Sequence, residues 1–183
     1  KVFWPIIALL VLNACQKDKE LVNPVQPIPV PVPSVDRNAL IITADNTGVF
    51  YANNALTGTS KWTYGASGMT AFAPAAVSSK YTIFADAATS SVYCIDTRNG
   101  YILWEKGGIN SSSLISPLLV NDYLYISNDN KLQVYDPENG DLLNELPVIP
   151  YPHTLNYVNG LLIYSNCGGH LVAMSTDGVQ QWE

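Results

Sequence analysis

The stretch TADNTGVFYANNALTGTSKW, residues 43–62, decides the fold. It contains a polar turn, a short β-rich segment, a second turn that ends in Gly58, and a strand that carries Trp62. The arrangement recurs three more times along the chain. The glycines are 42, 40 and 38 residues apart at Gly58, Gly100, Gly140 and Gly178. A repeat of about 40 residues built from short strands is typical of a β-propeller, in which each repeat forms one blade.

Each repeat offers four strand-like segments. In the first repeat, residues 39–42 and 49–52 precede the glycine turn and a third segment follows it. The fourth lies between repeats, as in residues 72–77 and 115–120. Four strands make one propeller blade. The sequence therefore predicts an all-β propeller of four-stranded blades over residues 39–183, with about three and a half to four blades present.

A tryptophan follows the glycine by four residues in three of the repeats, whereas the third repeat has Asn144 there. A buried tryptophan covers up to about 250 Å² and suits the gap between two blades. Glycine adopts positive φ in such turns at little cost. We therefore predict that these residues hold neighbouring blades together rather than stack on a ligand. The predicted docking residues are Gly58, Trp62, Gly100, Trp104, Gly140, Gly178 and Trp182.

The first repeat resembles the tryptophan-docking motif of the quinoprotein-like (PQQ-like) propeller family, Ala-x-Asp-x-x-Gly-x-x-x-Ala-x-x-x-x-Thr-Gly-x-x-x-Trp. Thr43 stands where the family has alanine. The resemblance covers residues 39–183 and implies the propeller fold. In that family the tryptophan stacks on the backbone of the next blade, so Asn144 removes one such contact. The matching residues are Asp45, Gly48, Ala52, Thr57, Gly58 and Trp62.

The N-terminal segment has the features of an export signal. Its apolar stretch ends at Leu12 and is shorter than the roughly 20 residues that cross a membrane as a helix. It is typical of a signal peptide, predicted here as residues 1–14. The residues Leu12-Asn13-Ala14-Cys15 resemble a bacterial lipobox, which implies a lipid on Cys15 and anchoring in a membrane. The alternative is a chance cysteine after an uncleaved apolar helix.

Residues 15–38 are predicted to be a lipidated cysteine followed by a tether. Gln16 follows the cysteine, which favours the outer membrane as the destination of an exported lipoprotein. Residues 16–20 resemble a surface-export signal of Bacteroidota lipoproteins, or form a charged spacer. Prolines at 24, 27, 29, 31 and 33 favour a semi-rigid polyproline II stalk. A ligand for a proline-binding module is the alternative reading of this stalk.

Charge and cysteine content exclude several classes of function. Residues 39–183 carry five Lys and Arg against twelve Asp and Glu, a net charge of −7. Without a basic stripe to neutralise phosphates, nucleic-acid binding is disfavoured. Cys94 and Cys167 lie two repeats apart and are expected to be free thiols.

The length bears on how many blades the protein has. Residues 39–183 are enough for roughly three and a half blades at about 40 residues each. The chain starts without methionine, and members of the resembled family have more blades. We expect the sequence to be the N-terminal part of a longer protein. A closed four-bladed ring is the alternative.

The residues that could act in catalysis or metal binding are predicted to have structural roles. Asp45, Asp96 and Asp136 stand at turns in roughly equivalent repeat positions, where carboxylates cap backbone amides. His153 is expected on a loop between blades, and His170 half-buried at the start of a strand. Neither has a partner at metal-binding spacing. We predict no catalytic residue, no metal and no cofactor.

The leading hypothesis is a lipid-anchored, non-enzymatic scaffold that binds protein or glycan partners at the outer membrane or cell surface. A resemblance to the propeller lipoproteins of the outer-membrane β-barrel assembly machinery implies the scaffold role. One alternative is part of a quinone-dependent dehydrogenase with PQQ and calcium, although this chain has no adjacent cysteines. Another is a surface polysaccharide-binding protein.

The loop over residues 147–153 is the candidate partner-binding surface. Its prolines lower the entropic cost of ordering apolar side chains on binding. We predict that Tyr151 is the main contact, with His153 a weaker second. The alternative is that Val148 and Ile149 fold inward and seal the blade junction.

Overall fold

The computed structural model describes residues 36–45, 47–65, 74–86, 88–109, 116–128, 130–148, 152–166 and 168–183, without the side chain of His153. The chain divides into two units, Lys1–Ser34 and Val35–Glu183, and every described residue belongs to the second. The predicted signal peptide, Cys15 and almost all of the tether lie outside the described residues.

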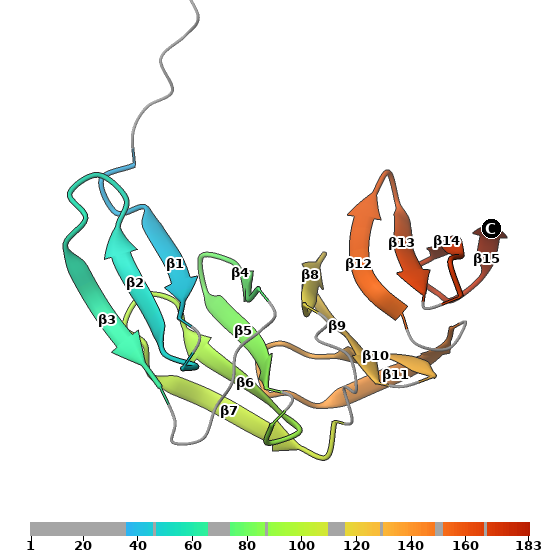
Figure 1. Ribbon diagram of the computed structural model, residues 1–183, viewed down its shortest axis with the longest axis horizontal. Coiled ribbons are helices and arrows are strands. Elements are labelled where there is room, and N and C mark those ends of the chain that lie inside the picture. The colour runs from blue at the N-terminus through green and yellow to red at the C-terminus, as the bar shows by residue number, and fades with distance from the viewer. Residues whose placement is uncertain are drawn as a thin grey trace, which may run out of the picture. The chain divides into compact units, whose positions relative to one another are not determined.

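The described residues form antiparallel sheets of consecutive strands, each corresponding to one sequence repeat (Figure 1). Blade 1 comprises β1 (Leu40–Ala44), β2 (Phe50–Asn54) and β3 (Ser60–Tyr64). Blade 2 comprises β4 (Ala76–Val77), β5 (Tyr81–Asp86), β6 (Ser91–Asp96) and β7 (Ile102–Gly107). Blade 3 comprises β8 (Leu118–Val120), β9 (Tyr123–Asn128), β10 (Lys131–Tyr135) and β11 (Leu142–Pro147). Blade 4 comprises β12 (Pro152–Val158), β13 (Leu161–Asn166), β14 (Leu171–Ser175) and β15 (Gln180–Trp182).

The predicted fold class is confirmed. Blades 2, 3 and 4 are four-stranded with the strands in chain order, and blade 1 has three strands among the described residues. The predicted between-repeat strands are present but short, because β4 and β8 occupy only the last residues of segments 72–77 and 115–120. No helix in the part of the chain that the structure describes is long and apolar enough to cross a membrane.

A β-bulge recurs at one place in every blade and fixes the register of the last strand. The pairing shifts immediately after Ala52, Cys94, Val134 and Ala173. As a result Trp62, Trp104 and Trp182 pair with small residues, whereas Asn144 pairs with Val134. Directly paired side chains share one face of a sheet. The small partner leaves room for an indole ring on the face that meets the next blade.

The apolar core lies between the blades. One cluster joins blades 1 and 2, with Phe50 and Phe84 stacked at a centroid distance of 4.0 Å. A second joins blades 2 and 3 and includes Cys94, and a third joins blades 3 and 4. Cys94 is fully buried and free, and burial raises the pKa of its thiol to about 12. This cysteine therefore acts as a packing residue.

Candidate functional site

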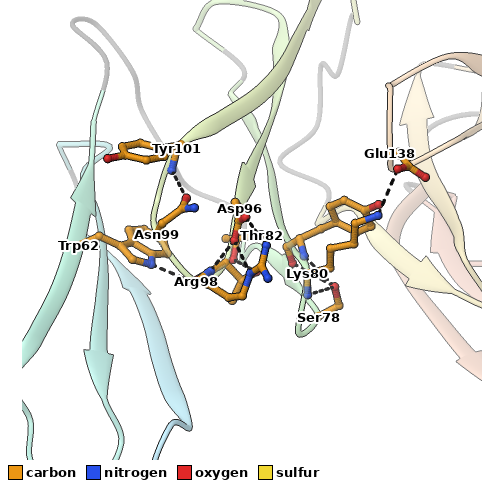
Figure 2. Close-up of polar contacts among 11 residues, drawn as sticks. Trp62, Ser78, Lys80, Thr82, Asp96, Arg98, Asn99, Tyr101 and Glu138 are labelled. Atoms are coloured by element: carbon orange, nitrogen blue, oxygen red, sulfur yellow. Dashed lines mark hydrogen bonds and ion pairs between the residues drawn. The ribbon is translucent and has the colours of Figure 1, made fainter.

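The joint between blades 1 and 2 is built around Trp62. Its indole is 8% exposed, and Nε1 donates a hydrogen bond of 2.8 Å to the carbonyl of Thr97 in blade 2 (Figure 2). A Cβ placed on Gly100 would lie 2.8 Å from Cγ and Cδ2 of the indole. Gly100 also has a φ of 75°. Both the backbone conformation and the ring contact therefore require glycine at this position.

The joint between blades 2 and 3 repeats this geometry. Nε1 of Trp104 donates to the carbonyl of Pro137 at 2.9 Å. A Cβ on Gly140 would lie 2.9 Å from the Trp104 ring and 3.0 Å from Cε of Lys106. Lys106 also pairs with Asp141 at 3.7 Å. This joint therefore holds an indole and a second long side chain.

The joint between blades 3 and 4 is different. Asn144 is exposed, and its Oδ1 accepts a hydrogen bond of 2.8 Å from the backbone N–H of Glu145. The residue nearest to a Cβ on Gly178 is Leu146, at 3.2 Å. Leu146 is 2% exposed. The contact with the glycine turn is thus made by a leucine two residues beyond the expected tryptophan, a substitution that the repeat motif did not indicate.

A groove of about 270 Å³, lined by both apolar and polar groups, lies at this third joint. Pro147 and Val148 line it from blade 3. Its blade 4 side includes Val172, Met174, Gly178 and Gln180.

Comparison of equivalent positions explains the groove. Blade 1 has Trp62 and Tyr64 where blade 3 has Asn144 and Leu146. Blade 2 likewise has Tyr93 where blade 4 has Val172. Three smaller side chains reduce the packed volume at this joint relative to the first joint, which favours a groove beside Gly178.

Gly58 and Trp182, the first and last predicted docking residues, do not show the tryptophan–glycine contact of the joints. No heavy atom of the described residues lies within 4 Å of a Cβ placed on Gly58, and Trp182 is 44% exposed. Within the part of the chain that the structure describes, no neighbouring blade packs against these two residues.

The Asp45 carboxylate accepts hydrogen bonds from the residues of its own hairpin. Its Oδ1 accepts hydrogen bonds from the backbone N–H and hydroxyl of Thr47 and from the N–H of Val49, and its Oδ2 accepts one from the Tyr51 hydroxyl. The hydrogen bonds from the Thr47 and Tyr51 hydroxyls hold the pKa of this carboxyl far below its usual range. The carboxylate therefore organises the hairpin between β1 and β2.

The three aspartates are not at equivalent positions, and that part of the sequence prediction is wrong. Asp96 and Asp136 precede the glycine turn, where blade 1 has Asn54, while the counterpart of Asp45 is Asp86. Each repeat contains two turns that favour Asp or Asn. Aspartates from these two different turns therefore look equivalent in the sequence. The capping itself is present. Asp96 accepts from the N–H of Arg98, and Asp136 from the N–H of Glu138, both at 2.8 Å.

The predicted partner surface is only partly described. Tyr151 and Ile149 lie outside the described residues, as does the side chain of His153. The expectation that His153 is on a loop is wrong, because β12 begins at Pro152. A proline is tolerated as the first residue of an edge strand, and β12 is the edge of its sheet. Val148 packs against the core between blades 3 and 4, as the inward-sealing alternative requires of it.

His170 is not half-buried, contrary to the sequence prediction. It precedes β14, is exposed, and its Nδ1 pairs with the carboxylate of Glu183. The strand begins at Leu171, one residue later than expected, because the turn closes through the Asn166 side chain, which accepts from the N–H of His170 at 3.0 Å. Among the described His, Cys, Asp and Glu residues, no group of three or more has the arrangement of a metal site.

Two further hollows lie beside the first strands of blades 2 to 4 and between blades 2 and 3. One of about 590 Å³ is lined by β4, β8, β12 and adjoining residues, none of them charged. The other, of about 510 Å³, lies between blades 2 and 3. There the Lys80 ammonium is 4.8 Å from the centroid of the Tyr81 ring and 3.4 Å from Glu138 (Figure 2). Both partners of this ion pair are exposed, so it contributes little to stability.

These joints have the organisation of the PQQ-like propellers, and comparison with protein families agrees. A family model described as outer membrane protein assembly factor BamB matches residues 21–159. The chain belongs to this family. A search of curated proteins finds no significant match.

Solved structures share the BamB-type fold. BamB from Moraxella catarrhalis matches with a TM-score of 0.66 at 19% identity, over 78% of this chain and 45% of that one. A europium-containing methanol dehydrogenase gives a TM-score of 0.60 at 14% identity, over 81% and 40% respectively. The computationally designed Ika4 protein gives 0.61 at 14%, over 77% and 87%. The chain thus spans less than half the length of the two natural proteins.

Proposed function

We propose that this protein is a lipid-anchored, non-enzymatic propeller scaffold that binds protein partners at the outer membrane. The observation that carries the proposal is the match of residues 21–159 to the BamB family, whose description names outer-membrane protein assembly. The sequence around Cys15 supplies the anchor, with the lipobox-like Leu12-Asn13-Ala14-Cys15. The partners proposed on this basis are proteins of outer-membrane assembly.

The side-chain chemistry of the blades supports a structural role for the acidic residues. Asp45, Asp96 and Asp136 bind amides and hydroxyls of their own turns. The carboxylates therefore hold the blades in shape and are already engaged. We propose that the protein works without a metal or an organic cofactor.

Affinity purification tests the scaffold role. The tagged full chain would be expressed in a bacterium with an outer membrane, crosslinked in the cell and purified from membranes. We expect specific recovery of β-barrel assembly proteins, and a strong reduction with Cys15→Ala, because the unanchored protein is no longer held beside them. Recovery of none of these proteins from a correctly localised, folded chain would overturn the proposal.

A dehydrogenase role is the second candidate, favoured by the structural similarity to a methanol dehydrogenase. It is tested by adding PQQ and calcium to the purified chain and measuring cofactor retention after desalting. Stoichiometric retention together with alcohol oxidation would replace the scaffold proposal. We expect neither.

A further inference from the structure

The groove at the third joint borders Gly178, the counterpart of the glycines that face an indole ring at the first two joints. At those joints the ring fills the space between blades and its N–H donates to a turn carbonyl, that of Thr97 or of Pro137. At the third joint the position of the tryptophan is taken by Asn144, and the turn before Gly178 is one residue shorter than in blades 2 and 3. The third joint therefore has the glycine and a groove beside it but not the ring.

The walls of the groove suit an aromatic guest. Val148, Val172 and Met174 provide apolar contact, and a methionine thioether packs favourably against the edge of a ring. The amide of Gln180 adds a polar group at the opening. Another protein's closed apolar cavity of about 150 Å³ takes up benzene, so a groove of about 270 Å³ has room for a larger ring.

We propose that this groove is a receptor for a tryptophan side chain carried by a segment of a partner protein. The chain's own joints suggest the guest, because Trp62 and Trp104 pack against the equivalent glycines in the other two. Buried tryptophans are also the side chains that most often dominate binding at protein interfaces. The inference rests on the proposed scaffold function, and specifies how one partner contact is made.

Met174 provides a direct readout. The chain has two methionines, Met69 and Met174, so methyl labelling of methionine gives two signals, which Met69→Leu assigns. We expect N-acetyl-tryptophanamide to shift the Met174 methyl signal in a saturable manner, through the ring current of the bound indole. N-acetyl-leucinamide should produce little shift. Equal saturable shifts from both compounds, or no saturable shift, would overturn the proposal.

A filled-groove variant and a matched control strengthen the test. Asn144→Trp should occupy the groove from within, shift the Met174 signal without ligand, and weaken probe binding by about tenfold or more, a loss of about 1.4 kcal/mol. The control Leu143→Trp adds the same side chain at the neighbouring bulge position, which is 52% exposed, and should leave probe binding unchanged. If Asn144→Trp does not fold, Leu146→Tyr restores the bulk found at position 64 and serves the same purpose.

The two proposals fail in different ways. If the tryptophan probe does not bind but the chain still recovers β-barrel assembly proteins, the groove proposal is wrong and the scaffold function stands. If the probe binds but no assembly protein is recovered, the scaffold function is wrong. Recovery of those proteins that is lost in Asn144→Trp and kept in Leu143→Trp would link the groove to the partner.

Discussion

The indole of Trp62 lies directly against the backbone of Gly100, across the joint between blades 1 and 2. The ring occupies the space in which any other residue would place its Cβ, and its N–H binds the Thr97 carbonyl in the same turn. The tryptophan of one repeat and the glycine of the next thus form a single contact. This dependence between repeats explains why the two residues recur together in the sequence.

Replacement of Trp62 by alanine should destabilise the protein by about 3 to 5 kcal/mol, the usual cost of removing a large buried aromatic side chain. Urea unfolding at neutral pH measures this through the change in midpoint. Lys61→Ala, on the exposed neighbouring residue, is the control and should have little effect. A Trp62→Ala protein as stable as the wild type would show that the indole does not hold the joint.

Gly100→Ala should be more destabilising than Gly58→Ala. Both glycines have positive φ, 75° and 68°, so both substitutions incur a similar backbone cost. Only Gly100 faces an indole, which overpacking would displace at a further cost of about 1 to 3 kcal/mol. Equal losses in urea midpoint for the two variants would mean that the ring contact contributes nothing.

Asn144→Trp should leave the free energy of unfolding unchanged or raise it, because the added indole fills the groove beside Gly178. Val134 pairs with position 144 where the other joints have alanine or cysteine, so the double variant with Val134→Ala should accept the ring more readily. Thermal unfolding of both variants tests this. A loss of several degrees in both would indicate that the joint cannot accept a tryptophan.

The Asp45 carboxyl should make stability depend on pH. Because hydrogen bonds from Thr47 and Tyr51 lower its pKa in the folded state, it stabilises the fold above its unfolded pKa of about 3.9. That contribution decreases as the pH falls below this value and is lost only when the pH falls through the much lower folded-state pKa. The urea midpoints of wild type and Asp45→Asn should therefore differ most at neutral pH, and the difference should shrink steadily as the pH falls below about 4. A difference that is constant over this range would contradict the assignment.

Cys15→Ala should abolish lipid labelling. In a bacterial host, radioactive palmitate should label the wild-type chain and not the variant, and residues 1–14 should be absent from the processed protein. Several acyl chains, at about 0.8 kcal/mol for each buried methylene group, anchor a protein firmly. Cys94→Ala is the control and should label normally. Equal labelling of the wild type and Cys15→Ala would exclude the anchor.

Most of the fold could be predicted from the sequence repeat, because the repeat consists of local features. The four glycine turns and the strands around them follow from turn chemistry and alternating apolar residues, and these indicated the blades correctly. The motif also marked Asn144 as an exception. That Leu146 takes over the contact with Gly178 depends on packing between two repeats, which no single repeat contains.

Besides the equivalence of the three aspartates, two predictions are wrong at the ends of elements. His153 was assigned to a loop because it follows a proline, yet an edge strand admits proline as its first residue. The sequence predicts that a strand begins at His170, but β14 begins one residue later at Leu171, because the Asn166 side chain closes the turn before it. The groove was not predicted because it results from three shortened side chains on two different blades.

Site-specific photo-crosslinking in cells tests the scaffold claim most directly. A photoreactive residue at position 151 would be compared with one at Ile41, which is 51% exposed on blade 1. We expect crosslinks from position 151 to a protein of the outer-membrane β-barrel assembly machinery, and none to that protein from position 41. The account would be contradicted if a membrane-anchored, folded chain gave no crosslink to that machinery from position 151 or gave the same crosslinks from both positions.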